Sequence, residues 1–223
     1  MSERDPIFAR IREALTASAP KPGTPHAADR PSPKSVHAVL PATGMTFEEN
    51  VELFRRNALE LKAAFHWVAD ANELAAQLVQ LRDAEGWKHV AAHPGELTDA
   101  ACRALRLPVC LASPGYDLNA MERCDAGISE CDALVAQTGS VVVTSRSAGG
   151  RALSVLPPHH VVIARRDQLV AGLPEAFALL QSKYGANYPS MMSFITGPSR
   201  TGDIERILVL GAHGPKKLTV FCV

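Results

Sequence analysis

Residues 133–143 read Ala133-Leu134-Val135-Ala136-Gln137-Thr138-Gly139-Ser140-Val141-Val142-Val143. Two short apolar runs flank a polar turn that contains a glycine, a pattern typical of two strands that follow one another in the chain. So short a connection favours antiparallel strands, because a parallel pair needs a crossover of a dozen or more residues. The stretch therefore predicts a strand-rich centre for this protein.

Apolar runs farther along the chain extend this centre. Residues 152–156 and 161–164 follow closely, separated from their neighbours by glycine and proline pairs, and predict two more strands. Residues 191–195 and 218–223 predict another strand and a final one.

Upstream of the centre the pattern is different. Residues 89–92 and 109–112 look like short buried strands, and a helical stretch around residues 97–106 lies between them. Strand, helix and strand in this order indicate parallel crossover units. Together with the centre, they predict an α/β fold in which a mixed sheet is flanked by helices.

Apolar residues at a spacing of three or four predict five further helices, at residues 3–17, 46–65, 71–84, 174–182 and 202–210. Thr46, followed by Glu48 and Glu49, suits the start of the second of these helices. Gly86 is expected to end the third, because glycine readily adopts the left-handed conformation found after many helices.

A proline-rich segment separates the first helix from the rest. Residues 18–44 hold six prolines with Gly, Ser, Thr and Ala between them, which is typical of an extended arm without a core of its own. We therefore expect an N-terminal helix and arm over residues 1–45, and one domain over residues 46–223.

The overall charge excludes some classes of partner. The chain has 223 residues, with 23 Lys+Arg and 23 Asp+Glu, so no strong global field attracts nucleic acid or anionic lipid. No apolar run approaches the roughly 18 residues that span a bilayer. The first residues also lack the features of a signal peptide. A cytoplasmic protein without nucleic-acid or membrane partners is expected.

The five cysteines do not form a recognisable framework. Their number is odd and no pair shows Cys-x-x-Cys spacing, which argues against a set of disulfides and against an iron–sulfur cluster held by this chain alone. We interpret them as reduced thiols that serve as small apolar residues.

Three segments, in order, carry a resemblance to a known family: residues 133–143, residues 153–161 and residues 197–205, the last continued by Val209-Leu210-Gly211-Ala212-His213-Gly214-Pro215. They resemble the LUD domain of the lactate utilization protein C family, and the resemblance covers roughly residues 46–223.

The resemblance implies a fold similar to that of the sugar-phosphate isomerase and CoA-transferase group (NagB/RpiA-like). It also implies a role in the oxidation of L-lactate to pyruvate, with two partner proteins rich in iron–sulfur cysteines. Because this chain lacks such cysteine motifs, the resemblance implies that the clusters belong to the partners and that this chain binds no cofactor by itself. Fold similarity alone does not transfer a reaction.

The segment Gly197–Glu205 is the leading candidate for a ligand site. It is expected to pass from a strand through a Gly/Pro turn into a helix start, where free N–H groups favour an anion. Ser199 and Thr201 would cap the helix or donate hydrogen bonds, Arg200 would hold a small carboxylate or phosphate, and Asp203 and Glu205 complete the segment. The alternative is a capped helix whose arginine pairs with a nearby acidic residue.

Thr138, Gly139 and Ser140 are candidates for a second wall of the site, because glycine lets a backbone approach a ligand and the hydroxyls donate hydrogen bonds. The alternative is a tight turn between two strands. His213 lies between two glycines, and it is expected either to stabilise a helix C-terminus or to face the site.

His159 and His160 precede a strand, and one of them is a candidate proton carrier; His159 is included in the predicted site. Alternation along a strand puts the two rings on opposite faces, so at most one should line a given pocket. Two adjacent histidines are a weak metal signal, and no metal site is predicted. Glu130 and Asp132 are interpreted as helix caps or solvated loop charges.

Three functions stay open at this point. The first is a subunit of an iron–sulfur-dependent system that oxidises L-lactate, to which this chain contributes a small-anion site. The second is a self-sufficient enzyme acting on a phosphorylated sugar or a CoA thioester. The third is a non-catalytic module that binds a metabolite, which the lack of a clear acid/base pair keeps open.

Overall fold

The computed structural model describes residues 4–16, 40–113, 115–202, 208–210 and 213–223. The chain divides into two compact units, Met1–Leu40 and Pro41–Val223. The first contains helix α1 (Arg4–Thr16), which confirms the helix predicted at residues 3–17. Most of the predicted arm at residues 18–44 lies outside the described residues. Over the described residues, none of the helices combines the length and the apolar composition that a membrane span requires.

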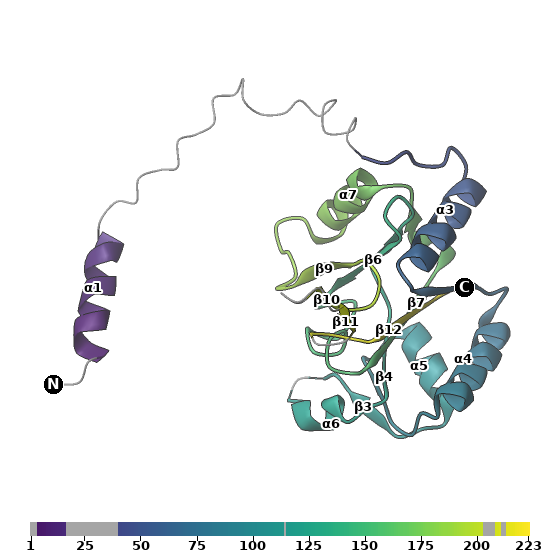
Figure 1. Ribbon diagram of the computed structural model, residues 1–223, viewed down its shortest axis with the longest axis horizontal. Coiled ribbons are helices and arrows are strands. Elements are labelled where there is room, and N and C mark those ends of the chain that lie inside the picture. Colours follow the sequence, from purple (N-terminus) through teal and green to yellow (C-terminus); the bar gives the residue numbers. More distant parts are fainter. Residues whose placement is uncertain (1–3, 17–39, 114, 203–207, 211–212) are drawn as a thin grey trace. The chain divides into compact units, whose positions relative to one another are not determined.

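The second unit is built around a parallel sheet of six strands in the order β1-β12-β7-β4-β2-β3 (Figure 1). All five pairings in this sheet are parallel. The strands are β1 (Ala64–Trp67), β12 (Lys217–Cys222), β7 (His159–Ala164), β4 (Ala126–Ser129), β2 (Val90–Ala92) and β3 (Val109–Leu111). Strands β2 and β3, joined through α5 (Glu96–Leu105), form the crossover unit that the sequence predicts.

A second sheet holds the strands predicted from residues 133–143. Its order is β8-β5-β6-β9, with β8 (Leu169–Val170), β5 (Ala133–Val135), β6 (Ser140–Thr144) and β9 (Met192–Ile195). Strand β6 is antiparallel to both β5 and β9, whereas β8 is parallel to β5. The α/β class is therefore confirmed, and the antiparallel pairs form this smaller sheet rather than part of the large one. The NagB/RpiA-like comparison stays a prediction.

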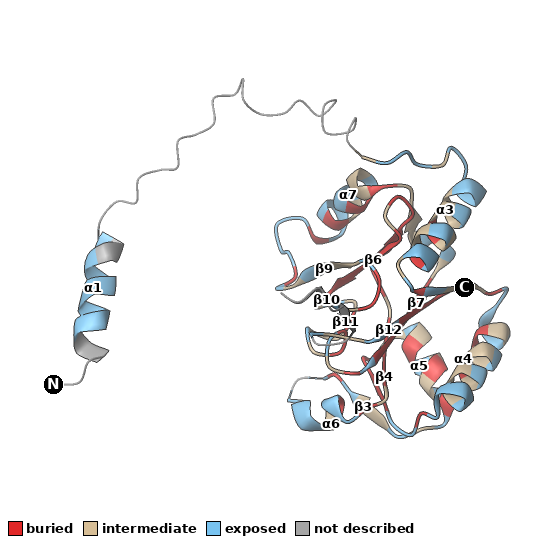
Figure 2. Ribbon diagram, viewed as in Figure 1, coloured by how far each residue is buried: buried red, intermediate tan, exposed pale blue. Residues whose placement is uncertain are grey.

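The two sheets and their helices form stacked layers, with the buried residues concentrated on the strands (Figure 2). Helices α4 (Ala71–Glu85) and α5 cover one face of the large sheet, where Leu78 and Leu105 pack on Ile163. Its other face packs on the small sheet, through residues such as Val162 and Val143. Helix α7 (Leu173–Tyr184) covers the far face of the small sheet.

Helix ends follow the capping residues that the sequence displays. Helix α3 (Phe47–Glu60) begins after Thr46, whose hydroxyl accepts from the backbone N–H of Glu49 while the Glu49 carboxylate accepts from that of Thr46. This reciprocal pair satisfies two N–H groups that have no partner inside the helix. Helix α4 ends at Gly86, which adopts a φ of 69° in the left-handed region, as predicted.

Two predicted elements are wrong. Residues 152–156 form turns instead of a strand. The helix predicted at residues 202–210 is contradicted at both of its ends, because Gly202 belongs to β10 (Arg200–Gly202), which pairs antiparallel with β11 (Leu208–Leu210). Short apolar runs fit a strand or a buried helix equally well, and here a partner strand decides the outcome.

Besides β10 and β11, the elements that were not predicted are β1, β4, β8, the short helix α6 (Leu118–Glu122) and the 3-10 helix at Arg166–Gln168. The helix expected over residues 46–65 ends early, and Lys62, with a φ of 66°, turns the chain into β1. Strand β4 contains a glycine and a serine, which weaken the strand signal. It forms because β2 and β7 supply hydrogen bonds on both of its sides.

Gly139 joins the small sheet to α3. Its φ is 63°, and a Cβ atom there would lie 2.9 Å from the backbone nitrogen of Ala58. The Asn57 side-chain amide donates to the carbonyls of Ala136 and Gln137, at 2.8 and 3.1 Å. The turn after β5 is therefore held directly against the end of α3.

We expect Gly139→Ala to destabilise the protein more than Gly86→Ala. Both glycines adopt similar positive φ angles, but a Cβ at Gly86 meets nothing within 4 Å. Gly86→Ala should lower the free energy of unfolding by about 1–2 kcal/mol, from left-handed strain alone. Gly139→Ala should lower it by about 1–3 kcal/mol more, because α3 must shift. Urea denaturation of both variants measures this difference, and equal losses would contradict the proposed close packing.

Candidate functional site

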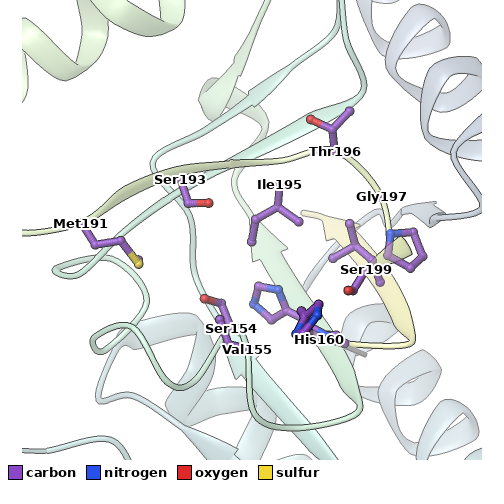
Figure 3. Close-up of a pocket in the computed structure, with 14 residues that line it drawn as sticks. Ser154, Val155, His160, Met191, Ser193, Ile195, Thr196, Gly197 and Ser199 are labelled. Atoms are coloured by element: carbon purple, nitrogen blue, oxygen red, sulfur yellow. The ribbon is translucent and has the colours of Figure 1, made fainter. Parts of the chain in front are cut away.

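A cavity of about 250 Å³ lies between the two sheets. It is bordered by β9 of the small sheet, by the first residues of β7 and β12, and by the loops beside them (Figure 3). The lining residues are 154–155, 160, 191, 193, 195–199, 213–215 and 218. Figure 3 shows Met191, Ser193 and Ile195 on one side of this space, with Ser154, Val155 and His160 facing them.

His160 reaches this cavity because side chains alternate along β7. Its neighbour in the sheet register is Gly127 of β4, where a Cβ atom would lie 2.6 Å from the carbonyl oxygen of Leu153 in the segment before β7. The ring is buried, and its Nε2 lies 2.8 Å from the Ser129 hydroxyl. Burial, with a smaller contribution from His159, lowers the pKa of His160 to about 3, so the ring is neutral at ordinary pH.

His159 points to the opposite face of the sheet and away from this cavity. Its Nε2 lies 2.9 Å from the Thr219 hydroxyl, and its ring packs edge-on against Trp87 at 5.2 Å. Burial is the main cause that lowers the pKa of His159, to about 4. One histidine of the pair lines the cavity, in line with strand alternation, but it is His160 rather than the predicted His159.

Three predicted site residues meet at the cavity: Gly197, Ser199 and His213. The backbone N–H of Ser199 donates to the carbonyl of Pro215 at 2.9 Å, which holds the two loops together. Gly197 adopts a φ of 86°, and a Cβ there would lie 2.9 Å from the Leu61 carbonyl oxygen. The close approach of this turn to the end of α3 therefore requires a glycine.

The other residues of the predicted segment are placed differently. The guanidinium of Arg200 donates to the carbonyl of Leu61 at the end of α3, where a cation is favourable. Arg200 is not among the residues that line the cavity. Residues 200–202 form a strand. The helix N-terminus that was expected to bind an anion is therefore not present at these residues. The Thr201 side chain, Asp203 and Glu205 lie outside the described residues.

Thr138 and Ser140 contact the cavity indirectly. The Thr138 hydroxyl lies 2.7 Å from that of Ser140, which lies 2.8 Å from the hydroxyl of Thr196 on the cavity wall. Gly139 sits in the turn between β5 and β6 and packs on α3, which is the structural alternative considered for it. These residues support the wall without lining it.

The two acidic residues before β5 differ in their roles. The Glu130 carboxylate accepts from the backbone N–H of Leu97 in the first turn of α5, the capping role expected for it. Its backbone N–H donates to Nε2 of His93, and Arg165 pairs with its carboxylate at 3.5 Å. These groups lie at the carboxyl ends of the strands, where open α/β sheets commonly bind ligands. In this structure Glu130, His93 and Arg165 bind one another through these contacts.

Asp132 is neither a cap nor a solvated charge, which corrects the interpretation made from sequence. Its side chain is fully buried and accepts from Lys183 Nζ and the Tyr184 hydroxyl, both at 2.6 Å. Burial by itself raises the pKa of Asp132. Hydrogen bonds from the Lys183 ammonium, the Ser147 hydroxyl and the Tyr184 hydroxyl together hold it below its usual value. The carboxylate ties the end of α7 to the small sheet.

The thiols behave as apolar side chains. Cys124, Cys131 and Cys222 are buried, and all five cysteines are free. Burial is the main cause that raises the pKa of Cys124 to about 11 and that of Cys222 to about 12, which disfavours the thiolate. Over the described residues, no group of three or more His, Cys, Asp or Glu side chains could hold a metal ion.

The second half of the chain is similar to proteins of known families. Residues 118–223 match the LUD domain model. Lactate utilization protein C of Geobacillus kaustophilus is 38% identical over 109 residues, which covers 48% of this chain and 45% of that protein. Lactate utilization protein C of Anoxybacillus flavithermus is 35% identical over 113 residues, half of each chain. The resemblance predicted from sequence is confirmed over this region.

The fold is also similar to that of a solved structure. The crystal structure of a DUF162 family protein from Deinococcus radiodurans superposes with a TM-score of 0.62 at 21% identity. The similarity covers 81% of this chain and 99% of that one. In contrast, the chain spans about half the length of the curated relatives that it matches.

We expect Asp132→Asn to lower the free energy of unfolding by about 1–3 kcal/mol at neutral pH, the contribution of hydrogen bonds to a charged group. The pKa of Asp132 is lower in the folded protein than the roughly 3.9 of an unfolded aspartate. Its stabilisation is therefore fully present above that value and is lost as pH falls through the folded pKa. The gap between wild type and variant should narrow below about pH 4.

Urea denaturation between about pH 3 and about pH 7 measures this gap. Asp83→Asn is the control, because Asp83 pairs with Arg82 on the surface, where an ion pair contributes less than about 1 kcal/mol. A pH-independent gap for Asp132→Asn would show that ionisation of this carboxylate does not stabilise the fold.

Proposed function

We propose that this chain is a subunit of an L-lactate utilization system, in which L-lactate is oxidised to pyruvate together with partner proteins that carry iron–sulfur clusters. The observation that carries the proposal is the LUD domain match over residues 118–223, with relatives named lactate utilization protein C. Since the chain spans about half the length of these relatives, their activity is a proposal for it.

The residues of this chain support separate roles for the chain and for its partner proteins. Oxidation of a hydroxy acid to a keto acid releases two electrons and two protons, which an acceptor must take. The described residues contain no group of metal ligands, and burial raises the pKa of thiols such as those of Cys124 and Cys222, which disfavours the thiolate that a cluster needs. We therefore propose that the clusters and the electron transfer belong to the partners, and that this chain binds no cofactor by itself.

The cavity between the sheets is the proposed small-molecule site. Its volume of about 250 Å³ is below the 300–1,000 Å³ of pockets that hold drug-sized ligands, and it suits a small carboxylate. Ser199 and His213 contribute hydrogen-bonding groups to it. A carboxylate fits better than a phosphate, because no Lys or Arg is found among the described residues that line it.

A non-catalytic, metabolite-binding role is the second candidate. Burial, with a smaller contribution from His159, lowers the pKa of His160 to about 3, which makes this ring a weak base, and the described lining includes no carboxylate. A general acid or base works best with a pKa near the working pH. Under this alternative the chain binds a metabolite and reports its level to a partner.

We expect a strain that lacks this gene to fail to grow on L-lactate and to grow normally on pyruvate, which bypasses the oxidation. An intact copy of the gene should restore growth on L-lactate. Growth curves on each carbon source measure this. Normal growth of the deletion strain on L-lactate, with no second lactate oxidase present, would refute the proposal.

The partner proteins are tested separately. Tagged chain purified from cells grown on L-lactate should bring down proteins that contain iron and acid-labile sulfide and that absorb visible light. The same purification from cells grown on glucose is the control. Recovery of the chain alone under both conditions would argue against iron–sulfur partners and favour the metabolite-binding alternative.

A further inference from the structure

A buried imidazole with one unsatisfied nitrogen borders the cavity. His160 is 1% exposed, and its Nε2 is paired with the Ser129 hydroxyl. Its Nδ1 is buried and has no hydrogen-bond partner among the described residues. A buried polar group without a partner is destabilising and is rare in native proteins. A ligand at this end of the cavity would supply the missing partner.

The surroundings of His160 have little charge. The described lining combines hydroxyl groups, such as Ser154 and Ser199, with apolar side chains, such as Ile195 and Leu218, and includes no Lys, Arg, Asp or Glu. The titratable groups nearby are His159, which is adjacent in β7 on the other face, and His213, which also lines the cavity. These surroundings therefore favour the neutral form of His160.

We propose that this cavity binds a short 2-hydroxy or 2-oxo monocarboxylate together with one proton, which His160 takes from solvent to form an imidazolium–carboxylate pair. The choice of acid rests on the proposed function, whereas the coupling to a proton rests on the site itself. No bond between heavy atoms forms or breaks in this step.

The physical reason is the cost of burying a lone charge. A carboxylate beside a neutral ring would leave its charge uncompensated in a largely apolar cavity, which is strongly unfavourable. Protonation of His160 makes the buried pair neutral overall. Both ring nitrogens then donate, Nε2 to the Ser129 hydroxyl and Nδ1 to the carboxylate. The lining hydroxyls would bind the remaining oxygen atoms of the acid.

Isothermal titration of the full chain with pyruvate and with L-lactate tests this, at about pH 6, 7 and 8 in buffers of different ionisation enthalpy. We expect uptake of about one proton per bound acid, and affinity that weakens about tenfold for each pH unit. Lactamide, an uncharged analogue of lactate, should bind more weakly and without proton uptake.

Three variants test which histidine takes up the proton when the acid binds. His160→Gln keeps a hydrogen-bond donor but takes up no proton, so both proton uptake and the pH dependence should disappear, with at least about tenfold weaker binding at pH 6. His159→Gln is the matched control, because His159 is also buried, on the same strand, and faces away. His159→Gln and His213→Gln should retain proton uptake. Thermal melting confirms that each variant is folded.

Proton uptake that is lost in His213→Gln but kept in His160→Gln would overturn the assignment to His160. Binding without proton uptake, or tighter binding of lactamide than of lactate, would overturn the proposal. If neither acid binds while growth on L-lactate still requires the gene, this inference fails and the proposed function stands. If the acids bind with a proton while the gene is dispensable for that growth, the opposite holds.

Discussion

The structure depends on the burial of β7 between layers on both of its faces. All six of its residues are buried, with Val161 and Ile163 facing the helices and Val162 and Ala164 facing the small sheet. Parallel strands covered on both sides are almost continuously apolar, because water reaches neither face. Any polar side chain on such a strand must find its partner inside the protein.

The adjacent histidines at the start of β7 meet this constraint in different ways. His159 pairs with Thr219 and packs on Trp87, whereas His160 pairs with Ser129 and borders the cavity. In both rings burial favours the neutral form. The cavity lies between the sheets at the amino ends of β7 and β12. It is therefore the packing of one sheet on the other that brings residues from loops far apart in the sequence to His160.

Polar contacts at the ends of β5 anchor the outer helices to the same core. Asp132 holds the last turn of α7 through Lys183 and Tyr184, and Asn57 of α3 caps the carbonyls that follow β5. Gly197 in turn packs against the end of α3, and Arg200 donates a hydrogen bond to a carbonyl there. The strands, the helices and the cavity wall are thus connected by a small number of specific contacts.

Local sequence patterns were enough to predict the α/β class, the antiparallel pair at residues 133–143, the capped ends of α3 and α4, and the alternation that separates His159 from His160. These follow from local rules of turn length, capping and side-chain period, which act over a few residues. The sequence also carried the resemblance to lactate utilization protein C, through motifs that stand in order along the chain.

The remaining features depend on contacts between segments that are distant in the sequence. Residues 208–210 became a strand because residues 200–202 pair with them, and residues 126–129 became one because two neighbours supply hydrogen bonds. Which histidine lines the cavity depended on which face of β7 meets the second sheet. Whether Asp132 is solvated or buried depended on where α7 docks. Such outcomes are set by partners distant in the sequence, so no local pattern could predict them.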